Sequence, residues 1–490
     1  MKICTTLKAA LLSMMLPLGL YAETPLDDYA AATRSLAAQE TAISALAEKH
    51  GRYSEQLVEP LQQLIHGQME VSRLEDAADN VDYAIHIVRT THGLNTPRQY
   101  DLQQLAIDID LYRQDWKDVN QRLDHYSNLL LSEYLGPADD FIMRMLWLGD
   151  AHVRGAIEDD AEKEAQHLRS ATWYATTAVS LARKYNLTHS RLYADMLYSL
   201  SQRYYLEARA ILDGGSTSYR LRMIQPGIHH VRDKFVALNR RYQLGLNALL
   251  ELRDTLAQSP GFSQEAVAMA EFHIADWKAL FDESEDLDSD YDQAISSLLA
   301  AGLADDQVQR FLAQPVVIPR AALETRIDDI LELNPRRIRD GAQDRLLSGM
   351  SLLEPSPQLA GFAQEARLVN WRGSLNKDWA EITVSLTVNP GDRVTVRNSA
   401  FRTRSRVTPS MVALRNTQAS PQLTNEALDR IQTLSFRPAF VDGKAVTSEV
   451  ELDYLVRDSE QRSITPLVTG NWVASFRVKA RGASPAAAGE

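Results

Sequence analysis

Pairs of amphipathic helices that recur about every 42 residues constrain this fold more than any other feature of the sequence. From about residue 30 to 310, apolar residues follow one another at spacings of three and four, and short turns containing Gly, Pro and Asn interrupt them. His50-Gly51 recurs 42 residues later as His92-Gly93. Three leucines hold matching positions 41 and 43 residues apart: Leu64, Leu105 and Leu148. Because a helix that buries one stripe needs a neighbour to cover it, this period predicts two-helix units stacked into a solenoid.

The turn between His92 and Pro97 resembles the long-repeat tetratricopeptide type seen in kinesin light chains. We therefore expect an all-α helical-repeat domain, similar to tetratricopeptide arrays, over residues 23–310. The small residue that the family has on the second helix of each unit is often replaced, for instance by Val119 and Tyr126, which leaves the number of repeats open. An irregular α-helical domain without true repeats is the alternative.

The N-terminus has the pattern of a secretory signal. Lys2 and Lys8 precede an apolar stretch at residues 9–20, and cleavage after Ala22 would make residues 1–22 a signal peptide. The apolar stretch is shorter than the about 20 residues that a membrane-spanning helix needs. We therefore expect a periplasmic protein with no integral membrane span after cleavage. Because Leu20 is larger than the residue usual at that position, an uncleaved inner-membrane anchor is the alternative, and N-terminal sequencing distinguishes the two.

Charge and cysteine content exclude several classes of function. Residues 376–480 hold 14 Lys and Arg against 11 Asp and Glu, and the rest of the chain holds 38 basic against 54 acidic residues. Such an acidic array is unsuited to nucleic acid, because phosphate binding needs a basic face. The only cysteine is Cys4. After cleavage the chain would have no disulfide, no thiol nucleophile and no Cys-ligated zinc.

The second half of the chain changes character twice. Prolines punctuate residues 311–370, which are predicted to form a helical connector. After Trp371 the period of the apolar residues changes from 3.6 to 2, which predicts strands. A clear alternation at 381–388 is followed by a Pro-Gly turn and a second strand at 393–396. The remaining predicted elements are a short helix at 425–433, an extended segment at 435–440, a turn at 442–444 and a strand at 448–456.

This order of elements resembles the C-terminal domain of TonB. The phrase that carries the resemblance lies between the helix and the last long strand: Phe436, Arg437, Pro438 and Ala439, then Asp442, Gly443 and Lys444. The resemblance implies a small α+β domain at residues 371–480, after which a disordered tail is expected at 481–490. We expect these motif residues to build the fold, with Gly443 in a tight turn and with Phe436 and Phe440 packing the helix onto the sheet.

The resemblance also implies a mode of binding. TonB-type domains bind outer-membrane receptors by accepting an extended receptor segment at a sheet edge, which is called β-augmentation. A TonB-dependent outer-membrane receptor is therefore a candidate partner, and the candidate partner-binding residues lie in the last strand: Glu449, Val450, Glu451, Leu452, Asp453 and Tyr454. The alternative role of the three acids is to keep an exposed edge soluble. An apolar segment at 471–478 departs from the family, and would occupy this edge if it paired there.

The sequence lacks the common motifs of catalysis and cofactor binding, including the phosphate loop, the nucleophile elbow and the dinucleotide fingerprint. The acidic stretch at 282–292 lacks the central Gly and closing Glu of an EF-hand, so we expect a solvated loop that caps the next helix. His152 and His167 are expected to be ordinary helix histidines, and Asp159-Asp160 to be charges near a helix start. We predict no catalytic residue, no metal site and no cofactor.

Taken as a multidomain protein, the chain is expected to act as a non-enzymatic scaffold of the periplasm. The helical array would bind a protein or peptide, and the TonB-like domain would dock a second partner of the cell envelope by strand addition. The alternative is a membrane-anchored, TonB-type accessory energy transducer for transport through outer-membrane receptors. A third hypothesis is an enzyme whose site is assembled from loops of the array, which a deep pocket lined by ionisable groups would favour.

Overall fold

The computed structural model describes most of the helical part of the chain and several segments of the C-terminal part. The described residues are 26–71, 73–113, 115–132, 134, 136–225, 229–230, 233–281, 287–313, 315–320, 323–328, 379–389, 409–417, 420–422, 424–425, 428 and 435–457. Several predicted segments lie outside them: the signal peptide (1–22), most of the connector (329–370), the second strand (393–396), the apolar segment (471–478) and the tail (481–490).

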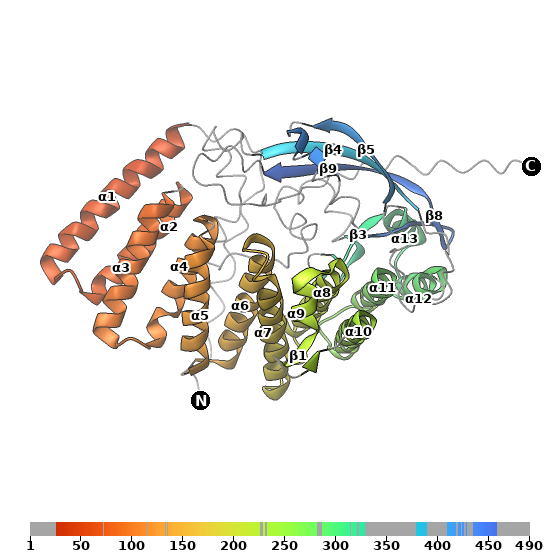
Figure 1. The fold of residues 1–490 in the computed structure, drawn as a ribbon, viewed down its shortest axis with the longest axis horizontal. Helices are drawn as coiled ribbons and strands as arrows, with labels where there is room; N and C mark the ends of the chain where they lie inside the picture. Colours follow the sequence, from red (N-terminus) through yellow and green to blue (C-terminus); the bar gives the residue numbers. More distant parts are fainter. Residues whose placement is uncertain are drawn as a thin grey trace, which may run out of the picture.

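Thirteen α-helices in the described ranges follow one another along an arc (Figure 1). They are α1 (Leu26–His50), α2 (Val58–Glu70), α3 (Leu74–His92), α4 (Tyr100–Arg113), α5 (Trp116–Ser132), α6 (Ala138–Glu158), α7 (Glu164–Lys184), α8 (Arg191–Asp213), α9 (Gly215–Arg222), α10 (Lys234–Gln258), α11 (Gln264–Leu280), α12 (Leu287–Ala300) and α13 (Asp305–Leu312). Most helices pack against the next one in the chain, while α9 lies beside α7 and α8, and α8 packs on α10. This arrangement is consistent with the predicted helical solenoid. No described helix is long and apolar enough to cross a membrane.

The His-Gly recurrence marks the same position in two successive helix pairs. Gly51 and Gly93 directly follow α1 and α3, with φ angles of 92° and 97° that glycine adopts without strain. Short 3-10 helices come next, η1 (Glu55–Leu57) and η2 (Pro97–Gln99). Their N-caps, Ser54 and Thr96, each accept a hydrogen bond from a backbone N–H two residues on. One local sequence therefore ends the first helix and starts the second in both units.

Ion pairs between residues about one period apart join successive units. Asp101, in the first turn of α4, accepts a hydrogen bond from Arg144 of α6 at 2.8 Å, and Glu55 forms an ion pair with Arg98 in the same direction along the array. The three leucines of the predicted repeat are buried on alternate helices, α2, α4 and α6: Leu64, Leu105 and Leu148. The periodic leucines therefore lie in equivalent, core-facing positions.

Among the described residues, three large hydrophobic cores lie along the arc and are joined by shared helices, and a small fourth core consists of Leu36, Leu64 and Val71. The first core lies between α2, α3 and one side of α4, and the second takes the other side of α4, including Ile107 and Leu111. In the same way α11 lies between two cores: Ile274 and Trp277 belong to the second core, and Phe272 belongs to the third, which includes residues of α12 and α13. Because each shared helix is buried on two sides, the array has the continuous interior that stacking of units produces.

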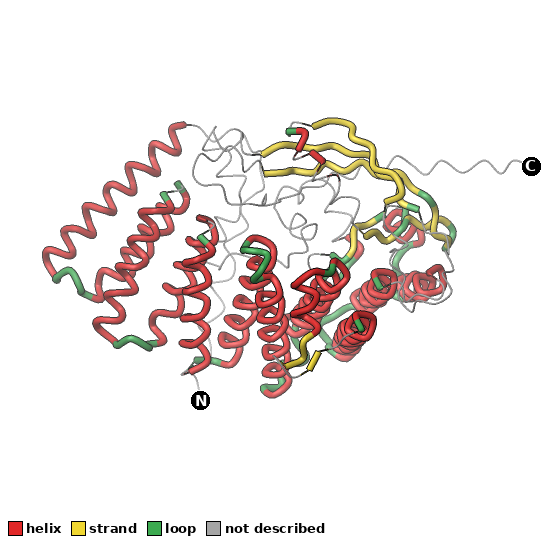
Figure 2. The backbone as a smooth tube through the Cα atoms, viewed as in Figure 1, coloured by secondary structure: helices red, strands yellow, loops and turns green. Residues whose placement is uncertain are grey.

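The C-terminal strands form three small antiparallel sheets (Figure 2). The strands are β3 (Val316–Ile318), β4 (Trp379–Val388), β5 (Pro409–Thr417), β6 (Ser435–Arg437), β7 (Ala439–Val441), β8 (Lys444–Val446) and β9 (Ser448–Arg457), and an earlier pair, β1 (Met223–Gln225) and β2 (His229–His230), lies within the array. One sheet has the order β5-β4-β9, and the other C-terminal pairs are β3 with β6 and β7 with β8. The predicted strands at 381–388 and 448–456 correspond to β4 and β9. Of the predicted helix at 425–433, the structure describes residues 425 and 428, and both are helical.

The strands pack directly onto the last helices of the array. The third core joins buried residues of α11, α12 and α13 to four alternate residues of β4: Ile382, Val384, Leu386 and Val388. Residues 316–318, predicted to belong to a helical connector, instead form β3, which suits three successive β-branched residues. Phe436 and Phe440 enter the same core as α11 to α13. They therefore pack the strands against the array, a role that was not predicted.

Candidate interaction site

All six candidate partner-binding residues lie in β9, at an edge of the three-stranded sheet as far as the structure describes it. β9 pairs along its full length with β4, from Trp379 opposite Arg457 to Val388 opposite Ser448. Among the described strands β4 is its one neighbour. An edge strand of this kind presents backbone N–H and C=O groups to any extended chain that comes beside it.

The register of β9 assigns its residues to the two faces of the sheet. Val450, Leu452 and Tyr454 are directly opposite Leu386, Val384 and Ile382, which are the buried residues of β4. Residues directly opposite each other in an antiparallel pair lie on the same face. These three positions of β9 are therefore on the face that packs against the array.

The acidic positions of β9 alternate with the apolar ones. Glu449, Glu451 and Asp453 are opposite Thr387, Ser385 and Thr383 of β4, all three of which are partly exposed. Glu449 is itself exposed. The described side chains on this face are thus polar: three hydroxyl residues on β4 and Glu449 at the start of β9.

The motif residues divide between a buried part and a turn. Phe436, Arg437, Pro438 and Ala439 are buried in β6 and at the start of β7. Asp442 and Gly443 form the turn between β7 and β8, with φ angles of 52° and 74°. Two successive positive φ angles are typical of the two-residue hairpin turns that match the twist of a β-ribbon. Lys444 follows as the first residue of β8 and is exposed.

Arg437 is the motif residue that ties the strands to the helical array. Its guanidinium donates from Nε to Oδ1 of Asp276 at 2.9 Å and from Nη2 to Oδ2 at 2.6 Å. Tyr291 of α12 donates to the same carboxylate at 2.7 Å. The guanidinium also lies over the rings of Phe272 and Phe311, at 4.9 and 5.3 Å from their centroids. Although burial lowers the pKa of Arg437, the charge of Asp276 raises it above its usual value, so the guanidinium stays charged inside the core.

The segment that follows β3 makes a second set of contacts with the array. Arg320 and Glu324 form a buried ion pair, with Nη2 and Oε1 2.7 Å apart. The backbone carbonyl of Arg320 accepts hydrogen bonds from Tyr198 and Gln202 of α8, at 2.9 and 2.5 Å. His273 of α11 contacts the carbonyl of Glu324 at 3.2 Å. The segment of the predicted connector that follows β3 is therefore attached to α8 and α11.

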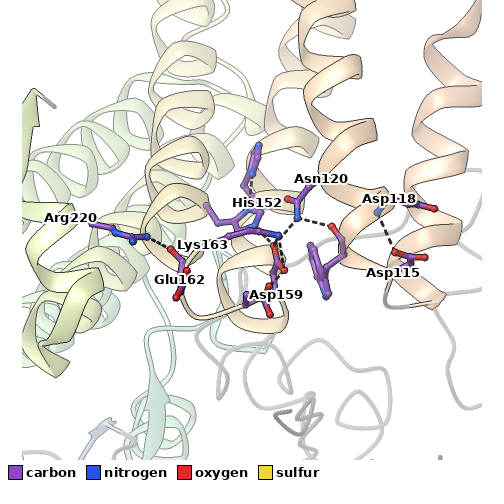
Figure 3. Close-up of polar contacts among 11 residues, drawn as sticks. Asp115, Asp118, Asn120, His152, Asp159, Glu162, Lys163 and Arg220 are labelled. Atoms are coloured by element: carbon purple, nitrogen blue, oxygen red, sulfur yellow. Dashed lines mark hydrogen bonds and ion pairs between the residues drawn. The ribbon is translucent and has the colours of Figure 1, made fainter. Parts of the chain in front are cut away.

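A cluster of polar side chains is buried where α5, α6 and α7 meet. Asp159, at the end of α6, accepts hydrogen bonds from Asn120 of α5 at 2.7 Å and from His167 of α7 at 3.0 Å. Asn120 and Lys163 both point toward this carboxylate (Figure 3). Nδ1 of His167 lies 2.9 Å from Nδ1 of His152 on α6. The sequence predicted two unrelated helix histidines, whereas the fold brings them into contact.

Burial decides the protonation of this cluster. It lowers the pKa of His152 to about 3, and the neighbouring His167 contributes to the same shift. It also lowers the pKa of His167, an effect that the hydrogen bond to Asp159 partly opposes. Burial alone raises the pKa of Asp159, but hydrogen bonds from Asn120 and His167 bring it below its usual value. At neutral pH the cluster therefore consists of two neutral rings and one carboxylate.

Neither a protein-family model nor a curated protein matches this chain. The resemblances to tetratricopeptide arrays and to the TonB C-terminal domain therefore remain predictions from the sequence.

In the described ranges, no group of three or more His, Cys, Asp or Glu side chains is placed to hold a metal ion. In the cluster of α5 to α7, His152 stacks on the ring of Tyr174, with the centroids 5.5 Å apart, and the hydroxyl of Tyr174 bonds to Ser127. The Asp159–His167–His152 chain thus ends on an aromatic face and not on a hydroxyl that a base could activate.

Proposed function

We propose that this protein is a non-enzymatic scaffold of the periplasm, with a tetratricopeptide-like array that binds one protein or peptide. Its TonB-like C-terminal part would dock a second partner of the cell envelope by strand addition to β9. The observation that carries the proposal is the position of β9 at the edge of the sheet in the described part of the chain. Strand addition uses backbone hydrogen bonds, so it gives affinity without demanding one particular partner sequence.

The attachment of the sheet to the array supports a scaffold role. The Arg437–Asp276 pair joins β6 to α11, and β6 also pairs with β3. The buried residues of β4 pack in one core with residues of α11, α12 and α13. A partner bound at β9 would therefore be held at a fixed position relative to a partner bound by the helices. Two binding surfaces in one rigid body bring their partners together, which is what a scaffold does.

The charge of β9 favours one kind of partner strand. Glu449, Glu451 and Asp453 occupy alternate positions, so a second copy of β9 paired here would bring acidic residues near one another. Like charges on paired strands are destabilising, whereas opposite charges stabilise the pair. We therefore expect the partner to be an extended segment with Lys or Arg at alternate positions, and not another copy of this chain.

A site-specific crosslinking experiment tests the proposal. Cys4 is the only cysteine, so Cys4→Ser with Glu451→Cys gives a unique thiol on β9 that can carry a photo-crosslinker. The matched control is Ser385→Cys, because Ser385 is opposite Glu451 on the central strand β4. We expect the β9 probe to form adducts with envelope proteins and the β4 probe to form few.

Competition with peptides adds the chemical detail. An extended peptide with Lys at alternate positions should suppress the adducts of the β9 probe, and the same peptide with Glu at those positions should not. Equal adducts from the two probes, or none from either, would contradict strand addition at this edge.

A further inference from the structure

The contact between His152 and His167 joins three helices near the middle of the array. His152 belongs to α6 and His167 to α7, and Asp159 links His167 to Asn120 of α5. Both rings are buried, with 7% and 2% of their surfaces exposed. Gly155 leaves space for this contact, because a Cβ there would overlap the ring of His167. The packing of α6 on α7 at this point thus depends on the absence of a side chain at position 155.

The geometry fixes how many protons the pair can hold. Because the carboxylate of Asp159 can only accept, Nε2 of His167 carries the hydrogen between them. In the neutral ring Nδ1 of His167 is then an acceptor, and Nδ1 of His152 must donate to it across 2.9 Å. One hydrogen therefore lies between the two facing nitrogens. If both rings were protonated, two N–H groups and two positive charges would face each other at this distance.

We propose that the His152–His167 pair is an acid-sensitive contact that keeps α6 and α7 closed at neutral pH and opens this part of the array when both rings are protonated. This inference concerns the helices alone and does not depend on the proposed binding at β9.

The surrounding charges do not neutralise a doubly protonated pair. Asp159 already accepts hydrogen bonds from Asn120, from His167 and from the backbone N–H of Asp160. Lys163, in the turn before α7, lies 3.3 Å from the same carboxylate and opposes protonation of His167. On α5, the charge of Asp124 favours protonation of His167 at longer range. The ring of Trp116, also on α5, packs edge-on against the ring of His167. On α7, the neutral Tyr174 stacks on His152.

The direction of the pH effect follows from burial. The folded pKa of His152 is about 3, below the ordinary value of 6.5, so the closed state is favoured fully above pH 6.5. This preference is lost as the pH falls from 6.5 toward 3, because the opened ring takes up a proton that the closed ring does not. Well below pH 6.5 the opening constant rises by about tenfold per pH unit for each proton taken up, and because the opened ring is already half protonated at pH 6.5, His152 alone gives about fiftyfold between pH 6.5 and 4.5.

Thiol labelling of the full-length chain tests the proposal. In a Cys4→Ser background, Ala151→Cys places a buried probe beside His152 on α6, and Ala77→Cys places a matched buried probe on α3. Labelling with 4,4′-dithiodipyridine, which reacts with thiols in acid, is measured between pH 6.5 and 4.5 and normalised to the unfolded chain. We expect the labelling of the α6 probe to rise by at least about fiftyfold, and the labelling of the α3 probe to change by less than tenfold. Ala171→Cys on α7 serves as a second probe if Ala151→Cys does not fold.

A non-titrating variant decides whether the histidines cause the effect. His152→Gln retains an amide that can donate to Nδ1 of His167 but removes the titrating ring. In this background we expect the rise at the α6 probe to shrink to less than tenfold. The proposal is overturned if the probes on α6 and α3 respond equally, which would indicate global acid unfolding, or if His152→Gln leaves the pH dependence unchanged.

Discussion

Arg437 and Asp276, which are 161 residues apart in the sequence, meet in a bidentate ion pair that is almost closed to solvent. Only 2% of the Arg437 side chain and 5% of the Asp276 side chain are exposed. The guanidinium lies over the rings of Phe272 and Phe311, and the hydroxyl of Tyr291 donates to the carboxylate of Asp276. The pair therefore connects a residue of β6 to α11 inside a buried core.

The first prediction concerns the energy of this pair. Arg437→Met leaves the carboxylate of Asp276 buried without its cation, which is expected to cost about 3–5 kcal/mol in the free energy of unfolding. The single variant Asp276→Leu likewise leaves Arg437 buried without its anion. The double variant, with Asp276→Leu and Arg437→Met, removes both charges and should be less destabilising than either single variant. Guanidinium denaturation of the three variants measures the differences.

An exposed ion pair provides the control. Arg310 and Asp306 are on α13, four residues apart, with 68% and 78% of their side chains exposed. Such a pair contributes about 0.5 kcal/mol or less, so Arg310→Ala should be nearly neutral. If Arg437→Met cost no more than Arg310→Ala, the buried pair would not be holding the strands to the array.

The second prediction is that the C-terminal part needs the array in order to fold. β6 pairs with β3, which precedes the predicted domain, and the apolar face of β4 packs on α11 to α13. A fragment of residues 371–490 should therefore show no cooperative unfolding, because it lacks β3 and the helices that cover its sheet. A fragment of residues 234–490, which retains both, should unfold cooperatively in circular dichroism. Cooperative unfolding of the shorter fragment would contradict this prediction.

Local signals made much of the array predictable. The glycines at 51 and 93 and the caps at 54 and 96 act within a few residues, so their recurrence could be recognised without the fold. The alternation of apolar residues in β4 likewise has a local cause, since one face of that strand is buried. Among the described strands β9 lies at the edge of its sheet, but an edge is set by which strands pair, and the local pattern does not specify that.

The long-range contacts could not be predicted in the same way. Asp276 lies between Ala275 and Trp277 on α11, and nothing in the local sequence identified Arg437 as its partner. β3 could not be predicted, because a strand of three residues is too short to show an alternating pattern. It also lies between Pro315 and Pro319 in a proline-rich segment. The meeting of His152 and His167 depends on how α6 and α7 pack, which the sequence pattern did not specify.

The third prediction tests the close approach of α10 and α11. A Cβ added at Gly245 would overlap the ring of Trp277, and the indole N–H of Trp277 donates to the carbonyl of Tyr242 at 3.0 Å. Gly245→Ala should therefore destabilise the protein by about 1–3 kcal/mol through overpacking. Gly261→Ala is the matched control, because a Cβ there meets nothing within 4 Å. Thermal unfolding of the two variants compares them, and equal melting temperatures would show that the α10–α11 contact can adjust freely.

The last prediction concerns the response of the C-terminal core to acid. His273 is buried on α11, and its Nε2–H donates to the carbonyl of Glu324 at 3.2 Å, beside the ring of Tyr198. Burial lowers the pKa of His273, although the nearby charges of Asp276 and Glu324 partly oppose this effect. Because the folded pKa is below 6.5, the contribution of the neutral ring to stability is complete above pH 6.5 and is lost as the pH falls below that value.

The size of this effect and its cause can be measured together. One histidine changes the free energy of unfolding by at most about 1.4 kcal/mol per pH unit, and His273→Gln should remove that share of the slope below pH 6.5, since the amide can still donate to Glu324 without titrating. His189→Gln is the control, because His189 is exposed in the turn before α8 and its ring stays in water in both states. As the pH is lowered from 8 to 4.5, the urea midpoint should therefore fall less steeply for His273→Gln than for the wild type and for His189→Gln. Parallel curves for all three would mean that the acid sensitivity of the protein arises elsewhere than in the core that joins α11 to the strands.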